Sequence, residues 1–497
     1  MEKIFEKKTL RQAQGKTLRQ AQGKIKKSEN FSEWYTDVIL KSGLADYAPV
    51  KGCMVIRPYG FALWENIKKS LDEMIRADGI SNAYFPIFIP FSFLKKEKEH
   101  IKGFSPQLAV VTHGGGKKLT EPLVVRPTSE TVIYAMYSKW IKSWRDLPLL
   151  INQWANIVRW EMRTYLFLRT MEFLWQEGHT CHRTHQEALG QVKKALARYQ
   201  SVYEDFLAIP GILGKKSEAE KFPGALDTLT FEMLMPDGKA LQGCTSHDLG
   251  QNFSKPFNIS FQDKNGKKSY VWQTCWGFTT RSIGALIMVH GDDQGLVLPP
   301  KIASIQVIII PIFEKSAIQN KKILAFAEKI KQDLIKSEIR VELDARKQYS
   351  PGWKFNEWEM KGVPLRIEVG QQEIKGKFVK IVRRDNNEQR TVNNEQLTKN
   401  ITKVLEEIRN NLYKKAQKFL RENTHQTDDY NEFKKIMKTK RGFIWAFWCE
   451  NPKCEEKIKK ETKATVRLLP LNAKKEVGKC IYCGKKAQHK WLFAQAY

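Results

Sequence analysis

Short strand-like segments separated by loops fill the stretch from Asn82 to Thr280, and they constrain the fold more than any other feature. Segments this short favour an antiparallel sheet over regular βαβ alternation. Pro86 interrupts the first segment, so we expect it at an edge or a break, because proline lacks the amide hydrogen of a ladder. The expected strands are 82–90, 123–127, 152–160, 172–177, 241–250 and 270–280.

Two helices are expected to precede these strands. Asn30, followed three residues later by Glu33, is typical of a helix start, and Gly43 of its end. Pro58–Ala77 carries a broad apolar face, as in a helix that covers a core. Helices beside an antiparallel sheet make α+β the expected fold class.

The pattern changes at Leu298-Pro299-Pro300. Ile305–Ile310 is a continuous apolar run, as in a strand covered on both faces, and the alternation that follows predicts a small α/β domain. A chain of 497 residues is too long for one domain. We expect a basic tail over 1–29 and domains over 30–297, 298–400 and 401–497. The tail contains two copies of KTLRQAQG. Two interpretations of this repeat are possible: a mobile tail, or a basic arm that contacts nucleic acid.

A formal net charge of +30 attracts a polyanion, and nucleic acid is the leading partner. An anionic membrane surface is the alternative, but no amphipathic anchor supports it. No apolar run of about 18 residues predicts a membrane span. The basic N-terminus lacks the apolar centre of a secretory signal, so we expect a cytoplasmic protein.

The segment from Asn156 to His179 is the richest in chemistry-bearing residues. Arg159 and Glu161 share one face of a strand, as do Glu177 and His179. Arginines over a sheet suit phosphate, because a guanidinium donates two parallel hydrogen bonds. Cross-strand ion pairs explain any single pair equally well. The recurrence of such residues at 242–247 and 279–281 favours a phosphate pocket.

Five segments together resemble the prolyl-tRNA synthetase family of class II. FLRTMEFLWQEGH is similar to motif 2, and Trp276–Pro300 (WGFTTRSIGALIMVHGDDQGLVLPP) to motif 3. Gly79–Pro90 resembles motif 1, with Pro86 at the motif proline. RPTSE resembles the proline-specific TxE loop, and Ser350–Gly370 (SPGWKFNEWEMKGVPLRIEVG) the anticodon-binding domain. The resemblance covers about residues 31 to 497.

The resemblance implies activation of L-proline by ATP and Mg²⁺ to prolyl-adenylate, then transfer of the prolyl group to tRNA(Pro). Losing one fixed donor at such a phosphate site costs about 10² to 10³ in rate. The implied catalytic residues are the phosphate-binding arginines Arg159, Arg169 and Arg281. The implied ATP contacts are these three with Glu161, Gln242, Thr245 and Thr279. The implied proline contacts are Thr128, Glu130, Arg159, Trp175, Glu177, His179, His247 and Cys275.

The resemblance also implies a class II antiparallel catalytic domain, an α/β anticodon-binding domain, a small α+β zinc-binding-like domain and a homodimer. The anticodon contacts it suggests are Trp353, Trp358 and Glu359, although core positions explain these aromatics as well. Only about sixty residues separate His179 from Gln242, too few for a large editing insertion. The chain therefore resembles the archaeal and eukaryotic type.

Two positions depart from the family pattern. Cys275 stands where serine is often found, and Gly370–Glu373 replaces the common GPRD. The first change is nearly isosteric and is expected to tune the proline pocket. The second puts local contacts on the anticodon side in doubt.

Four cysteines cluster near the C-terminus as C-x4-C and C-x2-C. Four thiolates close a tetrahedral site, so Cys449, Cys454, Cys480 and Cys483 predict structural zinc, with free thiols as the alternative. Residues 431–497 carry 17 Lys and Arg against 6 Glu, which is either a solvated surface or a phosphate contact. The terminal Tyr497 resembles a tyrosine that packs back toward the active site.

Three rival functions remain. A synthetase for another amino acid, such as threonine, is disfavoured by RPTSE and WQEGH. A non-catalytic tRNA-binding paralogue is expected to lose the phosphate arginines, yet all three are present. A zinc-dependent RNA-binding module accounts for the C-terminus but not for the first 300 residues.

Overall fold

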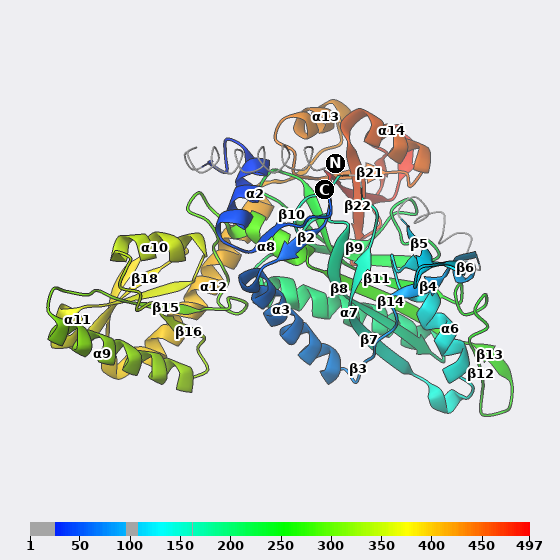
Figure 1. Cartoon of the computed structure of the whole chain (residues 1–497). Coiled ribbons are helices and arrows are strands. Elements are labelled where there is room, and N and C mark those ends of the chain that lie inside the picture. Colours follow the sequence, from blue (N-terminus) through cyan, green and yellow to red (C-terminus); the bar gives the residue numbers. More distant parts are fainter. Residues whose placement is uncertain (1–24, 96–107, 162) are drawn as a thin grey trace, which may run out of the picture.

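The computed structural model describes residues 25–95, 108–161 and 163–497, so the KTLRQAQG repeat lies outside the described residues. Eleven strands form one sheet in the order β20-β21-β25-β22-β9-β10-β11-β14-β8-β7-β3 (Figure 1). The pairings from β7 to β25 are antiparallel, which confirms the expected α+β class. The strands from the first part of the chain are β3 (Ser81–Asn82), β7 (Leu149–Val158), β8 (Glu172–His182), β9 (Ile212–Lys215), β10 (Asp227–Leu234), β11 (Ala240–Gly250) and β14 (Trp272–Thr279).

Helices cover both faces of this sheet, and local capping signals explain where several begin. Asn30 accepts a hydrogen bond from Glu33 N (3.2 Å), and Thr184 with Glu187 forms a capping box. The long helix over 58–77 packs its apolar face against the sheet through Leu63, Trp64 and Ile67. The helices are α2 (Phe31–Lys41), α3 (Pro58–Ala77), α6 (Glu130–Trp140), α7 (His185–Ser201) and α8 (Arg281–His290).

The expected strand over 82–90 is split into two short pieces. β3 lies before Pro86 and β4 (Phe88–Pro90) after it, so the proline marks a break. β4 pairs with β6 (Lys117–Val125), which pairs with β5 (Ala109–Gly114). Gly115 and Gly116 have φ of 56° and 76° and make the tight turn between β5 and β6. The glycine run is therefore a hairpin turn.

Several shorter elements also belong to this part of the chain. β1 (Ala45–Tyr47) pairs with β2 (Met54–Ile56), and β12 (Ser260–Gln262) pairs with β13 (Lys268–Tyr270). α4 (Phe91–Lys95) follows β4, and a π-helical turn, η3 (Val202–Phe206), continues α7.

The second unit is an α/β domain at the left of Figure 1. Its sheet has the order β16-β15-β17-β18-β19, with β15 parallel to both of its neighbours. Residues 307–310 in β15 are fully buried, as the continuous apolar run predicts. The elements are β15 (Val307–Pro311), α9 (Ala317–Lys336), β16 (Val341–Leu343), α10 (Pro351–Met360), β17 (Leu365–Val369), α11 (Gln371–Gly376), β18 (Phe378–Arg383) and β19 (Gln389–Asn393).

The C-terminal unit shares the large sheet of the first domain. β22 pairs with β9 through Leu469–Lys215 and Pro470–Gly214, so the ladder crosses from one domain to the other. Among the described residues, no helix is both long and apolar enough to span a membrane. α12 (Leu397–Glu422) connects the two units, and residues from Leu397 to Leu412 pack into the core of the second one. The elements that follow are β20 (Thr424–Gln426), α13 (Tyr430–Lys438), β21 (Phe443–Trp448), α14 (Pro452–Thr462), β22 (Ala464–Pro470), β23 (Gly478–Lys479), β24 (Lys486–Ala487) and β25 (His489–Gln495).

Candidate active site

Strand register gathers the proline-binding residues expected from the sequence on one face of the sheet. Cys275 on β14 pairs with His179 on β8 at one side and with His247 on β11 at the other. One step along, Gly277 pairs with Glu177 and Thr245, and beyond it Thr279 pairs with Trp175. Side chains two residues apart share a face, so these three rows form one floor.

Glu177 is the centre of a buried hydrogen-bond network in this floor. Ser129 Oγ and Gln153 Nε2 donate to Glu177 Oε1 (2.5 and 2.7 Å), and His179 Nε2 lies 3.0 Å from Oε2. Tyr134 OH lies 3.2 Å from the other ring nitrogen of His179. Burial alone would lower the pKa of His179, but the hydrogen bond and charge of Glu177 raise it above its usual value. The network therefore favours an imidazolium–carboxylate pair.

Thr128 and Glu130 stand where the RPTSE segment turns into α6. Thr128 Oγ1 donates to the Glu130 carboxylate, and both side chains are buried, at 4% and 3% exposure. A carboxylate has about four acceptor sites, so the bond from Thr128 is compatible with a cationic ligand at Glu130. Burial lowers the pKa of the nearby Arg159 guanidinium, and the charge of Glu130 opposes that effect.

Two guanidinium groups lie beside the floor. Arg159 Nε donates to Pro127 O (3.1 Å), and its guanidinium stacks over Trp175 at 5.8 Å. Arg281 Nε donates to Leu168 O (3.2 Å) and its Nη1 to Gln242 O (3.5 Å). Burial, together with the charge of Arg281, lowers the pKa of Arg159 to about 10. Cations held close enough to repel one another favour a polyanionic ligand.

The third predicted arginine is the most exposed of the set. Arg169 has 52% of its side chain exposed and donates through Nε to Glu161 Oε2 (2.7 Å). Its positive charge contributes to the lowered pKa of Arg281, although burial contributes most. Thr279 Oγ1 accepts from Arg281 N (3.1 Å), and Gln242 and Thr245 are partly buried on β11. The ATP-binding residues expected from the sequence thus surround one cationic region.

The four C-terminal cysteines converge although 25 residues separate the two pairs. Their sulfur atoms all lie within 4.8 Å of one another, and Cys449 Sγ is 3.7 Å from both Cys454 Sγ and Cys483 Sγ. Tetrahedral Zn–S bonds of about 2.3 Å place two sulfurs about 3.8 Å apart. This donor set and spacing fit a four-thiolate zinc ion.

The three expected anticodon residues have different surroundings. Trp353 is 43% exposed, and its ring stacks on Tyr349 at a centroid distance of 3.8 Å. Trp358 is 6% exposed, and its indole donates to Asp344 Oδ2 (2.9 Å), so it is a core residue with little surface for a base. Glu359 pairs with Arg366 Nη1 (2.9 Å). Trp353 is therefore the strongest candidate for stacking on an unpaired base.

Sequence reasoning missed the residues that hold the predicted ones. Ser129 and Gln153 fix the Glu177 carboxylate, and Tyr134 contacts His179. Ser129 lies within RPTSE, and Tyr134 lies one helical turn after Glu130. The RPTSE motif was therefore a usable signal for both residues. Gln153 carries no local signal, because its role depends on its register opposite Glu177.

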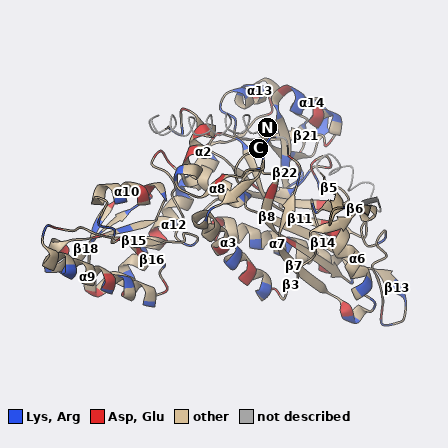
Figure 2. Cartoon of the chain, viewed as in Figure 1, with Lys and Arg blue, Asp and Glu red and all other residues tan. Residues whose placement is uncertain are grey.

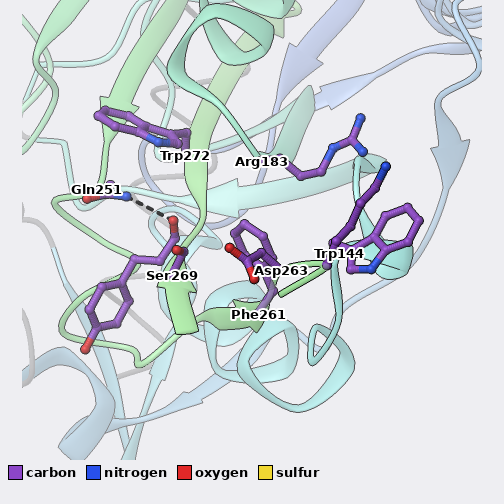
Figure 3. Close-up of a pocket in the computed structure, with 9 residues that line it drawn as sticks. Trp144, Arg183, Gln251, Phe261, Asp263, Ser269 and Trp272 are labelled. Carbon is purple, nitrogen blue, oxygen red and sulfur yellow. Dashed lines mark hydrogen bonds between the residues drawn. The ribbon is translucent and has the colours of Figure 1, made fainter. Parts of the chain in front are cut away.

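A separate pocket of about 350 Å³ lies near the start of β14 (Figure 3). Gln251 Nε2 donates there to Tyr270 O (2.9 Å). Asp263 Oδ1 accepts hydrogen bonds from the backbone amides of Asn265 and Lys267. None of the residues expected to bind ATP or proline lines it, so we place the reacting centre at the floor and not here. The pocket is lined by Trp144, Arg183, Gln251, Phe261, Asp263, Lys264, Ser269, Tyr270 and Trp272.

Three family models match the chain in succession. Residues 115–290 match the tRNA synthetase class II core domain (G, H, P, S and T), 306–404 the anticodon binding domain, and 430–497 the prolyl-tRNA synthetase C-terminal model. The proline–tRNA ligase of Natranaerobius thermophilus is 52% identical over 95% of this chain and 97% of its own length. That of Chlorobium chlorochromatii is 51% identical over 95% and 98%. The chain belongs to the class II prolyl-tRNA synthetase family.

Proposed function

We propose that this chain is a proline–tRNA ligase that converts L-proline and ATP to prolyl-adenylate and pyrophosphate, then transfers the prolyl group to tRNA(Pro). The observation that carries the proposal is the register of β8, β14 and β11. The register puts the buried Glu177–His179 pair beside Cys275 and His247, and Arg159 and Arg281 lie beside this floor. This arrangement supports adjoining sites for the ammonium group of an amino acid and for a polyphosphate.

The residues suit the first reaction without a general base. The proline carboxylate is already ionised, and its repulsion from the α-phosphate is the obstacle. Arg159, Arg169 and Arg281, with Mg²⁺ carried by ATP, offset that repulsion through fixed positive charge. Glu130 accepts from the secondary ammonium, and Trp175 offers a flat apolar wall to the ring.

The second reaction needs the 3′ end of tRNA at the same floor. Its terminal ribose hydroxyl attacks the carbonyl of the mixed anhydride, and AMP leaves. Lysines on α13 and α14 suit contacts to RNA phosphates (Figure 2). Such contacts position the RNA, while stacking on Trp353 suits an unpaired anticodon base.

The test is ATP–pyrophosphate exchange with each of the twenty amino acids in turn, without tRNA. We expect exchange to be strongest with proline. Exchange with threonine instead would overturn the pocket assignment and keep the activation chemistry. Folded protein with Mg²⁺ that supports no exchange would indicate a tRNA-binding paralogue.

The stretch between β8 and β11 consists of α7, η3, β9 and β10, and we assign no editing activity to it. A pocket discriminates by only about 1 to 3 kcal/mol per methylene, so some alanine is expected to be attached. Incubation with Ala-tRNA(Pro) tests this, and clear deacylation by the chain would contradict it.

We assign one structural zinc ion to the four cysteines and a homodimer to the assembled enzyme. Tyr84 and Phe88, within the segment that resembles motif 1, expose 72% and 47% of their surfaces. Exposed large apolar groups are typical of surfaces that a partner covers. Sedimentation at several concentrations tests the dimer, and a monomer at all of them would contradict it. We expect the enzyme to work in the cytoplasm.

A further inference from the structure

A buried cluster of charges joins the C-terminal domain to the strands beside the ATP-binding region. Arg467 on β22 donates through Nη2 to both carboxylate oxygens of Glu232 on β10 (3.0 Å each). Lys216, just after β9, donates through Nζ to Glu232 Oε1 (2.6 Å). Arg467, Glu232 and Lys216 are 5%, 0% and 2% exposed. One carboxylate therefore holds two cations from two domains.

Glu232 lies on the same side of the sheet as the candidate active-site floor. On the paired strand, Glu232 is opposite Gln242, and Thr230 is opposite Thr245. Thr230 Oγ1 donates to Glu232 Oε1 (3.3 Å). The cluster on β10 and β9 therefore lies beside Gln242 and Thr245, the residues of β11 that are expected to bind ATP.

The cluster is also linked to Arg281. Arg281 Nη1 donates to Gln242 O, on the residue opposite Glu232. The charges of Glu232 and Arg467 both act on the pKa of Arg281, although burial has the largest effect and lowers it. Arg467 and Lys216 hold the pKa of Glu232 below its usual value against the opposing effect of burial.

We propose that Arg467 of the C-terminal domain is a positioning residue for ATP. By neutralising Glu232 it holds β10 against β11, and so fixes the positions of Gln242, Thr245 and Arg281. Without Arg467, Lys216 is the one described residue whose cation bonds directly to Glu232, and the strand pair that carries the ATP contacts shifts. The inference rests on the assignment of Gln242, Thr245 and Arg281 to ATP.

The test compares KM values in proline-dependent ATP–pyrophosphate exchange. Arg467→Met is expected to raise KM for ATP about tenfold and to change KM for proline by less than about twofold. The conservative variant Arg467→Lys keeps a cation beside Glu232 and is expected to recover most of the loss. The double variant Arg467→Met with Glu232→Gln leaves Lys216 as a buried cation without Glu232, so it is not expected to recover the loss. If Arg467→Met does not fold, Arg467→Lys and Arg467→Gln give the same comparison.

Arg383→Met is the matched control, because Arg383 is also 5% exposed and pairs with Asp385 (2.8 Å), but in the second domain. It should leave both KM values unchanged in this tRNA-free assay. Folded Arg467→Met or Arg467→Gln with an unchanged KM for ATP, or with equal rises in both KM values, would overturn the proposal. Gln242→Ala distinguishes failure of the ATP-binding assignment from failure of the proposed role of Arg467. If this variant leaves KM for ATP unchanged, the assignment of Gln242 to ATP is wrong, whatever Arg467 does.

Discussion

Arg281 is the first residue of α8, and two backbone carbonyls fix its guanidinium beside the floor. A preorganised donor of this kind contributes about 3 to 4 kcal/mol to a transition state that gains negative charge. Arg281→Ala is therefore expected to lower kcat for prolyl-adenylate formation by about 10² to 10³. Arg145→Ala is the control, because Arg145 is exposed and lies over Trp144. Equal loss in both variants would contradict the role of Arg281.

His179 has a raised pKa, so its charged form is favoured in the folded protein. Its contribution to the free energy of unfolding is then complete below the unfolded pKa of about 6.5 and is lost as pH rises through the folded pKa. The stability difference between wild type and His179→Gln should be largest near pH 6 and shrink as the pH rises above it. Urea unfolding across this range measures it, and a difference that grows with pH would contradict the pairing.

For single residues, sequence motifs predicted candidate site residues but not the residues that hydrogen-bond to them. Glu177 was predicted as a site residue because its segment, FLRTMEFLWQEGH, is long and specific. Ser129 and Gln153, which hold Glu177, emerge only from the pairing of β7 with β8. Trp358 was predicted as an anticodon contact because an aromatic side chain suits stacking on RNA. In the structure its side chain is buried and its indole donates to Asp344, which the sequence did not indicate.

Among the elements, β8 and β14 lie against each other so closely that one glycine has no room for a side chain. A Cβ at Gly178 would lie 2.1 Å from Cε2 and Cζ2 of Trp276. Gly178→Ala should therefore reduce the free energy of unfolding by about 1 to 3 kcal/mol. Because Glu177 and His179 flank it, KM for proline should rise as well.

Gly190 provides the opposite case on α7. A Cβ there meets nothing within 4 Å, and the residue is in a helix interior. Gly190→Ala should raise the free energy of unfolding by up to about 1 kcal/mol, since alanine favours helix. Urea unfolding of both variants measures the contrast. Equal effects of the two substitutions would show that the contact with Trp276 is not what disfavours a side chain at 178.

Elements with strong local signals were predicted closely. The helix over 58–77 has the predicted bounds, and the predicted strands 152–160 and 241–250 correspond to β7 and β11. β9 and β10 were not predicted. Their places in the sheet depend on contacts between distant residues, which a local sequence pattern does not show. The capping box of Thr184 and Glu187 was a usable signal for α7.

On the scale of the whole molecule, one sheet crosses from the first domain into the last. Composition changes suggest a boundary near residue 401, and local sequence does not reveal that β22 closes the edge of β9. Glu455 in α14 accepts from Ser217 Oγ (3.0 Å), so the helix with Cys454 also touches the first domain. The cysteine cluster therefore belongs to a unit that is continuous with the large sheet.

Removing the metal should destabilise more than the C-terminal domain. Purified protein is expected to hold about one zinc per chain, and chelation or Cys480→Ser should remove it and lower Tm. Because β22 covers β9, KM for ATP should rise in the metal-free protein, while the matched Cys53→Ser, outside the cluster, should change neither quantity. Metal analysis with thermal unfolding measures this. An unchanged Tm after complete removal of zinc would mean that the four thiols hold the domain together without it.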